Sequence, residues 1–427
     1  MKSIYTLFFL LLSLTALAQT RSVKVSPPLT EASAASVGMS TERLGRIDEM
    51  CKKAVEADHL PGMVVLVARH GKIVHHKAYG MADNLSGRLM NKNDIFRIAS
   101  QTKAITATAV MMLWEEGKFR LDDPVSRYIP EFENAQVLDT LFEDGTYETK
   151  PANKTITIRH LLTHTSGIGY GITGKDERFK KIYPEAGVID LATTENFSIG
   201  ENVKRLARLP LHHHPGEKYT YGLGLDVLGY FIEVVSGLPL DEFFRTRIFN
   251  PLGMEDTWFY LPESKHQRLV TVQKKEEGKW VKFPVTFYDP DYPVKGAKRY
   301  FAGGAGLCST ARDYATFLQM YLNNGELNGT RLLSRTTVQA IMANQIGDIW
   351  AWNDRTYGLA FGILKQKGQD LGGRGSVGTF DWGGYFNTQY FADPKEQIIG
   401  IFMKQTREVS DDTAPKFRRL VMQAVDD

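Results

Sequence analysis

The chain has 427 residues, of which 43% are hydrophobic and 24% are charged, as in an ordinary globular protein. Its formal net charge is +3 and its positive residues form no basic block, which argues against nucleic acid as the main partner. No apolar run after the N-terminal segment is long enough to span a bilayer, so we expect no integral membrane segment in the mature protein.

Residues 1–18 have the pattern of a secretory signal peptide. Lys2 precedes an apolar core over residues 7–12, and Ala16-Leu17-Ala18 forms a small-residue cleavage site. An apolar core of about a dozen residues is too short for a membrane anchor. We therefore predict cleavage before Gln19, a loose polar lead-in over residues 19–36, and a secreted or periplasmic domain over residues 37–427.

The first part of this domain is predicted to contain a helix and a strand pair. Apolar residues recur at helical spacing over residues 41–56, and Ser40 is a suitable N-cap. Residues 63–68 are continuously apolar, as in a buried strand, and residues 73–79 return after a turn. Residues 104–114 form a predicted helix, and a short one within residues 157–167 stops at a glycine.

Helices and loops dominate from roughly residue 120 to 300, and strands return late in the chain. We expect strands over residues 357–364, 382–392 and 398–403, followed by an amphipathic helix over residues 415–425. Strands thus occur at both ends of the chain with helices between them. This order predicts an α+β fold, with one antiparallel sheet built from both ends, flanking helices and an inserted, mainly helical region.

The chain contains a single S-x-x-K pattern, formed by Ser100 and Lys103. Residues three apart on a helix share a face, so the Lys103 amine can reach a Ser100 hydroxyl at the helix N-terminus. A serine hydroxyl becomes a good nucleophile when a neighbouring group takes its proton, and the helix N-terminus favours a developing oxyanion. The alternative is a helix-capping serine beside a surface lysine.

Two later stretches have features of supporting site elements. Residues 215–229 place Tyr221 at the start of a helix, where a phenol near an ammonium can relay a proton; the alternative is core packing. Gly383 and Gly384, between Trp382 and Tyr385, lie in a predicted strand. Glycines there let a ligand approach the backbone, so that an N–H can donate to a substrate carbonyl; the alternative is a bulge or turn.

Taken in order, these stretches resemble the serine β-lactamases and penicillin-binding-protein-like hydrolases. The closest likeness is to the family VIII carboxylesterases, which are similar to class C β-lactamases. The resemblance runs from about residue 37 to residue 425 and also includes residues 160–167, Pro215-Gly216 and residues 303–310.

This resemblance implies a role for each site residue. Ser100 would be the acylated nucleophile, and Lys103 and Tyr221 would share the general-base role and protonate the leaving alcohol. The oxyanion hole would be the backbone N–H groups of Ser100 and Tyr385. Trp382-Gly383-Gly384 would occupy the strand position of the β-lactamase K-T-G motif, and no metal or organic cofactor would be needed.

Two departures from the β-lactamase pattern favour an esterase. Leu223 stands where the second motif, Y-x-N, has an asparagine, and it cannot hydrogen-bond a substrate amide. Trp382 replaces the lysine that binds a β-lactam carboxylate. Losing one such charge-assisted bond costs roughly 1.5–3 kcal/mol. W-G-G is common in the third motif of the esterase branch.

Other patterns have weaker functional interpretations. His160 and His164, and separately His212-His213-His214, contain metal-binding residue types but lack a full ligand spacing, so no metal site is predicted. Cys51 and Cys308 are expected as buried thiols, with a disulfide as the alternative in an exported protein. Aromatic residues could line an acyl pocket or simply pack, namely Trp350, Trp352, Tyr385 and Phe386.

The sequence therefore predicts an exported serine hydrolase that cleaves carboxylic esters of small molecules through an acyl-enzyme. One alternative is a β-lactamase or D-alanyl-D-alanine carboxypeptidase acting on β-lactam or peptidoglycan-like substrates. A second is an inactive homologue that binds a ligand in the same cleft.

Overall fold

The structure is a computed structural model, and it describes residues 21–350 and 352–427. The predicted signal peptide and its cleavage site lie outside these residues. Within them, the main sheet has nine strands in the order β1-β3-β2-β17-β16-β15-β14-β13, with β4 paired to β3. The strands are β1 (Thr30–Glu31), β2 (Gly62–Arg69), β3 (Lys72–Asp83), β4 (Arg88–Leu89), β13 (Arg355–Tyr357), β14 (Gly362–Leu364), β15 (Phe380–Gly383), β16 (Gln389–Asp393) and β17 (Ile398–Met403).

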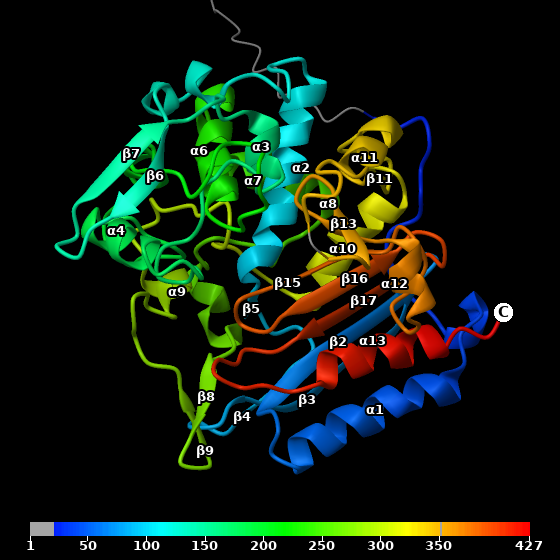
Figure 1. Cartoon of the computed structure of the whole chain (residues 1–427). Coiled ribbons are helices and arrows are strands. Elements are labelled where there is room, and N and C mark those ends of the chain that lie inside the picture. Colours follow the sequence, from blue (N-terminus) through cyan, green and yellow to red (C-terminus); the bar gives the residue numbers. More distant parts are fainter. Residues whose placement is uncertain (1–20, 351) are drawn as a thin grey trace, which may run out of the picture.

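Strands from the two ends of the chain meet at β2 and β17, which pair antiparallel with Leu66 opposite Ile401. The first strand departs from the predicted pattern, because β1 pairs with β3 in parallel. The mixture of this sheet with flanking helices confirms the predicted α+β fold (Figure 1).

Strand β2 is buried on both faces, and its alternating side chains separate two hydrophobic cores. Val64, Leu66 and Ala68 belong to the larger core, and Met63, Val65 and Val67 to the smaller one. Figure 1 shows α1 (Thr41–Glu56) and α13 (Thr413–Gln423) lying side by side over the face that carries the smaller core. The opposite face is covered by α10 (Ala311–Leu322) and the helical region.

Helix α2 (Thr102–Glu115) lies at the centre of the helical region, with every residue from Thr102 to Leu113 buried. A helix that is buried all round has no polar face, which is why its sequence lacks amphipathic periodicity. It packs against α6 (Gly224–Ser236), which also contacts α3 (Ile158–Leu162). The remaining helices are α4 (Phe179–Glu185), α5 (Ile199–Leu206), α7 (Leu240–Phe244), α8 (Asn250–Leu252), α9 (Tyr292–Lys295), α11 (Arg335–Ile341) and α12 (Gln366–Asp370).

The structure corrects two strand predictions and adds strands to the mainly helical region. That region contains two hairpins, β6 (Gln136–Leu141) with β7 (Tyr147–Pro151) and β8 (Gln273–Glu276) with β9 (Lys279–Lys282). Residues 357–364 and 382–392 are not single strands, because each contains a turn that joins two strands of the main sheet. The turns pass through left-handed residues, Ala360 at φ +68° and Asn387 at φ +68°. Residues 398–403 form β17 as predicted.

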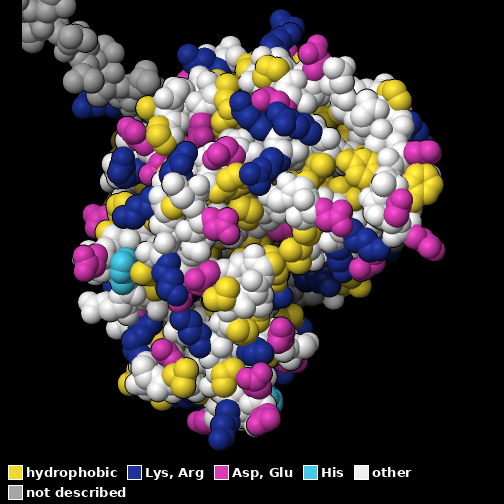
Figure 2. Space-filling model, turned by 90° about the vertical axis from the view of Figure 1, so that its left-hand side faces the viewer, with side chains coloured by type: hydrophobic (Ala, Val, Ile, Leu, Met, Phe, Trp, Pro, Cys, Tyr) yellow, Lys and Arg dark blue, Asp and Glu magenta, His cyan; other side chains and the backbone are white. Residues whose placement is uncertain are grey.

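The face shown in Figure 2 displays Lys and Arg intermingled with Asp and Glu, in keeping with the small net charge. Among the described residues, no helix is long and apolar enough to cross a membrane. Cys51 and Cys308 are both buried and unpaired, and they lie in different hydrophobic clusters. The predicted buried thiols are thus confirmed.

Candidate active site

Ser100 lies in a strained turn between a short strand and the central helix. β5 (Phe96–Arg97) pairs with β10 (Cys308–Ser309) and leads into the 3₁₀ turn η2 (Ala99–Gln101), which continues directly as α2. The turn places Ala99 at φ +43°, in the left-handed region that non-glycine residues adopt infrequently. Ser100 itself is half-buried, so its hydroxyl remains accessible.

Lys103 is only 1% exposed, and its amine has three hydrogen-bond acceptors. Nζ donates to Ser100 Oγ at 3.2 Å, to the Tyr170 hydroxyl at 3.0 Å and to the Gly304 carbonyl at 2.7 Å. An ammonium has three N–H donors, so this environment satisfies all of them. The S-x-x-K pair is therefore in direct contact, as its spacing predicts.

Tyr221 lies beside this pair, although its hydroxyl bonds to neither member. Its ring centroid is 4.7 Å from Lys103 Nζ, within the range of a cation–π contact. The hydroxyl oxygen instead accepts the indole N–H of Trp382 at 3.1 Å. The structure thus brings together four of the predicted residues, and gives Trp382 a contact with Tyr221 that sequence reasoning did not foresee.

Tyr170 contacts Lys103 and is a candidate site residue that the sequence did not point to. It is 6% exposed, and burial raises the pKa of its phenol well above the ordinary value, with the nearby Tyr221 and Asp226 acting in the same direction. It is brought beside Tyr221 by two glycines, because a Cβ on Gly222 would be 2.4 Å from the Cα of Gly169. The sequence feature that could have pointed to Tyr170 is its position between two glycines, Gly169 and Gly171, shortly after the motif at residues 160–167.

His164 supports the tyrosine segment and has no metal-site surroundings. The predicted helix ends at Leu162, before Gly167, because His164 adopts φ +56°. Its Nδ1 accepts the Gly222 N–H at 3.4 Å, and its ring lies 4.5 Å from that of Tyr221. Burial, followed by the charge of Lys103, holds the pKa of the imidazole well below its usual value, so the ring is neutral.

The other histidines also have structural partners. His160 Nδ1 accepts the Thr157 N–H in a capping box at the start of α3. His212 stacks on Phe179 with ring centroids 3.4 Å apart, and His213 bonds to Thr220 at 2.9 Å. Across residues 21–350 and 352–427, no cluster of three His, Cys, Asp or Glu side chains is arranged to bind a metal ion.

The glycine pair of the third motif lies at the end of a strand and not inside one. Gly383 is the last residue of β15, and Gly384 begins the turn to β16. A Cβ on Gly384 would be 2.4 Å from the Ile98 carbonyl oxygen, so this glycine lets the turn approach the segment that contains Ser100. In the described part of the chain, the backbone N–H groups of Ser100 and Tyr385 donate to no protein acceptor.

Aromatic side chains flank the reactive groups on two sides. Trp350 stacks on Tyr219 and on Trp352, and contacts Tyr357 edge-on next to Trp382. On the other side, a separate apolar cluster joins Ala99, which precedes Ser100, to Phe386 and Tyr288, with Tyr385 packed against it. Among the predicted aromatics, the two tryptophans therefore lie on the Trp382 side, and Tyr385 and Phe386 lie on the Ala99 side.

Comparisons with known proteins agree on one family. The sequence model of the family described as Beta-lactamase matches residues 47–423. Esterase EstB of Burkholderia gladioli is 34% identical over 363 residues, which cover 82% of this chain and 86% of that protein. A putative D-alanyl-D-alanine carboxypeptidase of Escherichia coli K12 is 28% identical over 83% of this chain and 80% of its own. The solved structure of EstCE1, a hydrolase with promiscuous acyltransferase activity, superimposes with a TM-score of 0.76, 26% identity, and coverage of 89% and 98% of the two chains.

Proposed function

The chain belongs to the β-lactamase family of serine hydrolases, and we propose that it cleaves carboxylic esters through an acyl-enzyme on Ser100. The observation that carries this proposal is the convergence of the Ser100 hydroxyl, the Lys103 amine and the Tyr221 ring from separate parts of the chain. The three groups are partly or fully shielded from bulk water. Electrostatic interactions are stronger in such a shielded site than in water.

The proposed reaction has two halves. Ser100 Oγ attacks the ester carbonyl carbon while its proton passes to the Tyr221 oxygen, which acts as a phenolate stabilised by the adjacent Lys103 ammonium. The resulting oxyanion accepts hydrogen bonds from the backbone N–H groups of Ser100 and Tyr385. The departing alkoxide takes the proton that came from Ser100 as the C–O bond of the ester breaks. Water then loses a proton to the Tyr221–Lys103 pair and attacks the acyl carbon. As the bond from the acyl carbon to Oγ breaks, the pair returns that proton to Ser100 Oγ and the acid leaves.

Tyr221 is better suited than Tyr170 to exchange this proton. Its hydroxyl is half-buried and accepts the Trp382 indole N–H, a donor that would also stabilise a phenolate oxygen. Tyr170 is more deeply buried, and burial keeps its pKa well above the ordinary value, so it remains a neutral acceptor of the Lys103 N–H. We assign Tyr170 the role of holding Lys103 in place.

Replacing each tyrosine by phenylalanine separates these roles. We expect Tyr221→Phe to lower kcat for ester hydrolysis by roughly two decades or more, the usual range for an acid–base group. Tyr170→Phe removes only one of three Lys103 acceptors, and we expect a loss of about tenfold or less, corresponding to about 1 kcal/mol. Steady-state rates on p-nitrophenyl butyrate compare them; a larger loss for Tyr170→Phe would reverse the assignment.

Ester hydrolysis is favoured over β-lactam hydrolysis by the side chains that replace the β-lactamase residues. Leu223 is fully buried and offers no amide donor, and the Trp382 indole is engaged with Tyr221. The relative EstB is named an esterase, whereas the Escherichia coli relative is named a putative carboxypeptidase. We infer that small-molecule esters are the substrates, with β-lactams or peptidoglycan-like peptides as poor ones.

Three measurements on the purified protein test this proposal. We expect kcat/KM for p-nitrophenyl butyrate to exceed that for a chromogenic cephalosporin by at least one to two decades, the cost of one missing charge-assisted bond. Comparable or reversed rates would favour the amide-hydrolase alternative. A fluorophosphonate should add one adduct on Ser100, as seen by intact mass; no adduct and no turnover would support an inactive binding homologue.

We also propose that the protein is exported, on the basis of the signal pattern at residues 1–18. N-terminal sequencing of protein recovered from the periplasm or medium should give a chain that begins at Gln19.

A further inference from the structure

A buried carboxylate lies directly behind the Ser100–Lys103 pair. Asp226 occupies the first turn of α6 and is 1% exposed. Its Oδ1 accepts the backbone N–H of Gly304 at 3.0 Å. Its Oδ2 is buried and has no hydrogen-bond partner within the described part of the chain. A buried carboxylate oxygen without a donor is costly, so its presence calls for a compensating charge.

Gly304 connects this carboxylate to Lys103. The N–H of Gly304 donates to Asp226, and its carbonyl accepts the Lys103 amine at 2.7 Å. The contact requires glycine, because a Cβ at this position would lie 2.2 Å from Asp226 Oδ2. The loop is fixed on both sides, since Thr106 of α2 donates to the Gly303 carbonyl at 2.6 Å and Gly303 packs against Gly229 of α6.

We propose that Asp226 is a positioning residue of the proposed active site. Its carboxylate acts as the buried counter-charge of the Lys103 ammonium and, through the backbone of Gly304, fixes the position from which Lys103 reaches Ser100. This inference rests on the proposed function, because it assigns Asp226 a part in the same proton transfer. Asp226 is not part of the S-x-x-K and tyrosine motifs, and it contacts none of the reacting atoms. Its role is to position Lys103 through Gly304.

Among the titratable groups around Lys103 and Asp226, Asp226 is the suitable counter-charge for Lys103. Tyr170 and Tyr300 face it as phenols whose pKa values are well above normal because of burial, so both are uncharged. His164, next to Lys103, is neutral because burial holds its pKa well below the usual value. Asp190 is a second nearby acid, but its two oxygens bind the Gly171 N–H and the N–H and hydroxyl of Thr173.

The ionisation of Asp226 falls in an accessible pH range. Burial raises its pKa to about 6, against the opposing effect of Lys103. The carboxylate is therefore charged above about pH 6 and becomes neutral as the pH falls through that value. If the charge of Asp226 supports proton transfer, kcat should fall as the pH is lowered through about 6.

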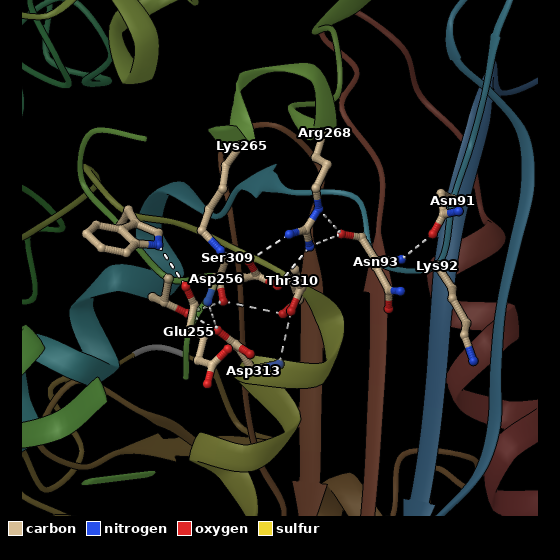
Figure 3. A network of polar contacts seen from close by, with 12 residues as sticks. Asn91, Lys92, Asn93, Glu255, Asp256, Lys265, Arg268, Ser309, Thr310 and Asp313 are labelled. Carbon is tan, nitrogen blue, oxygen red and sulfur yellow. Dashed lines mark hydrogen bonds and ion pairs between the residues drawn. The ribbon is translucent and has the colours of Figure 1, made fainter. Parts of the chain in front are cut away.

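The test compares Asp226→Asn with a matched variant, Asp313→Asn. Asp313 is also a buried aspartate in the first turn of a helix, α10, and burial raises its pKa to about 6 as well. Figure 3 shows that it lies in a different network, near Asp256 and Thr310. Its side chain accepts hydrogen bonds from the Asp256 N–H and from the Thr257 hydroxyl. The two variants thus remove the same group from the same helix position, with and without a link to Lys103.

We expect Asp226→Asn to lower kcat for p-nitrophenyl butyrate about tenfold at pH 8 with little change in KM, because it removes a buried charge that interacts with Lys103. We also expect it to abolish the fall in kcat through about pH 6. Asp313→Asn should keep both the wild-type rate and the fall. Fluorophosphonate titration corrects each rate for the folded fraction, and Asp226→Ser serves if the amide variant does not fold.

The inference is overturned if Asp226→Asn keeps the wild-type rate, or if its rate falls by one factor at every pH so that the acid limb survives. Failure of the proposed function looks different, because wild-type protein would then neither hydrolyse the ester nor accept the fluorophosphonate.

Discussion

Replacing Ser100 by alanine is expected to reduce ester hydrolysis to near the uncatalysed level, a loss of about four decades or more. No other group takes over the covalent step, because Lys103 is buried and directed at Ser100 itself. The fold should persist, since the variant loses one hydrogen bond from a half-buried side chain, worth about 1 kcal/mol. Hydrolysis of p-nitrophenyl butyrate and thermal unfolding measure the two effects.

Ser309→Ala is the matched control for this variant. Ser309 is a buried serine on β10, opposite Phe96 of the strand that leads to Ser100, and its hydroxyl bonds to Thr257 at 2.8 Å. We expect this change to cost stability but to leave ester hydrolysis and fluorophosphonate labelling intact. Residual turnover in Ser100→Ala above a tenth of the wild-type rate would mean that another nucleophile forms the acyl-enzyme.

The architecture could be predicted largely because its strongest signals are local. The continuous apolar run at residues 63–68 and the amphipathic helix over residues 41–56 each depend on periodicity within one segment. The late strands were misjudged because their turns contain apolar residues. Leu359, Ala360 and Phe361 are all buried, so the turn between β13 and β14 lacks the polar residues that mark a loop.

The proximity of the candidate site residues could be predicted because Ser100 and Lys103 occupy one helical turn, and Tyr221 and Trp382 lie in recognisable motifs. Tyr170 and Asp226 were not found, since their importance depends on contacts between distant segments. Tyr170 meets Lys103 only because Gly169 and Gly222 let two loops touch. Asp226 is linked to Lys103 through Gly304. The sequence does not indicate which residues the glycine-rich segment around Gly304 contacts.

Replacing Lys103 by alanine is the second change with a large expected effect. We expect kcat for p-nitrophenyl butyrate to fall by roughly two decades or more, because the variant lacks the amine that shares the proton of Ser100. If Lys103→Ala stayed fully active, Lys103 would have no part in proton transfer. Lys72→Ala is a suitable control, since that lysine bonds to Thr30 at the edge strand and contacts no site residue.

The same variant should also lose stability in a pH-dependent way. Without Lys103, Asp226 loses the charge that now lowers its pKa, so its pKa in the folded state should rise further above about 6. A carboxyl whose pKa is higher in the folded than in the unfolded state binds more protons when folded, so the free energy of unfolding decreases as the pH rises. We therefore expect Lys103→Ala to be destabilised more at pH 8 than at pH 4.5, where Asp226 is mostly protonated, by about 1.4 kcal/mol for each unit of added shift.

Combining Lys103→Ala with Asp226→Asn tests the link between these two effects. The double variant has no buried carboxylate left without its counter-charge, so urea unfolding at pH 8 should recover most of the stability lost by Lys103→Ala, whereas hydrolysis should stay low. Additive losses of stability would show that the two side chains do not interact in the folded protein. A non-additive result would distinguish two effects of Lys103. Its charge compensates the buried Asp226 carboxylate, and this need disappears when Asp226 is replaced by an amide. Its amine takes part in proton transfer at Ser100, and that function is not restored.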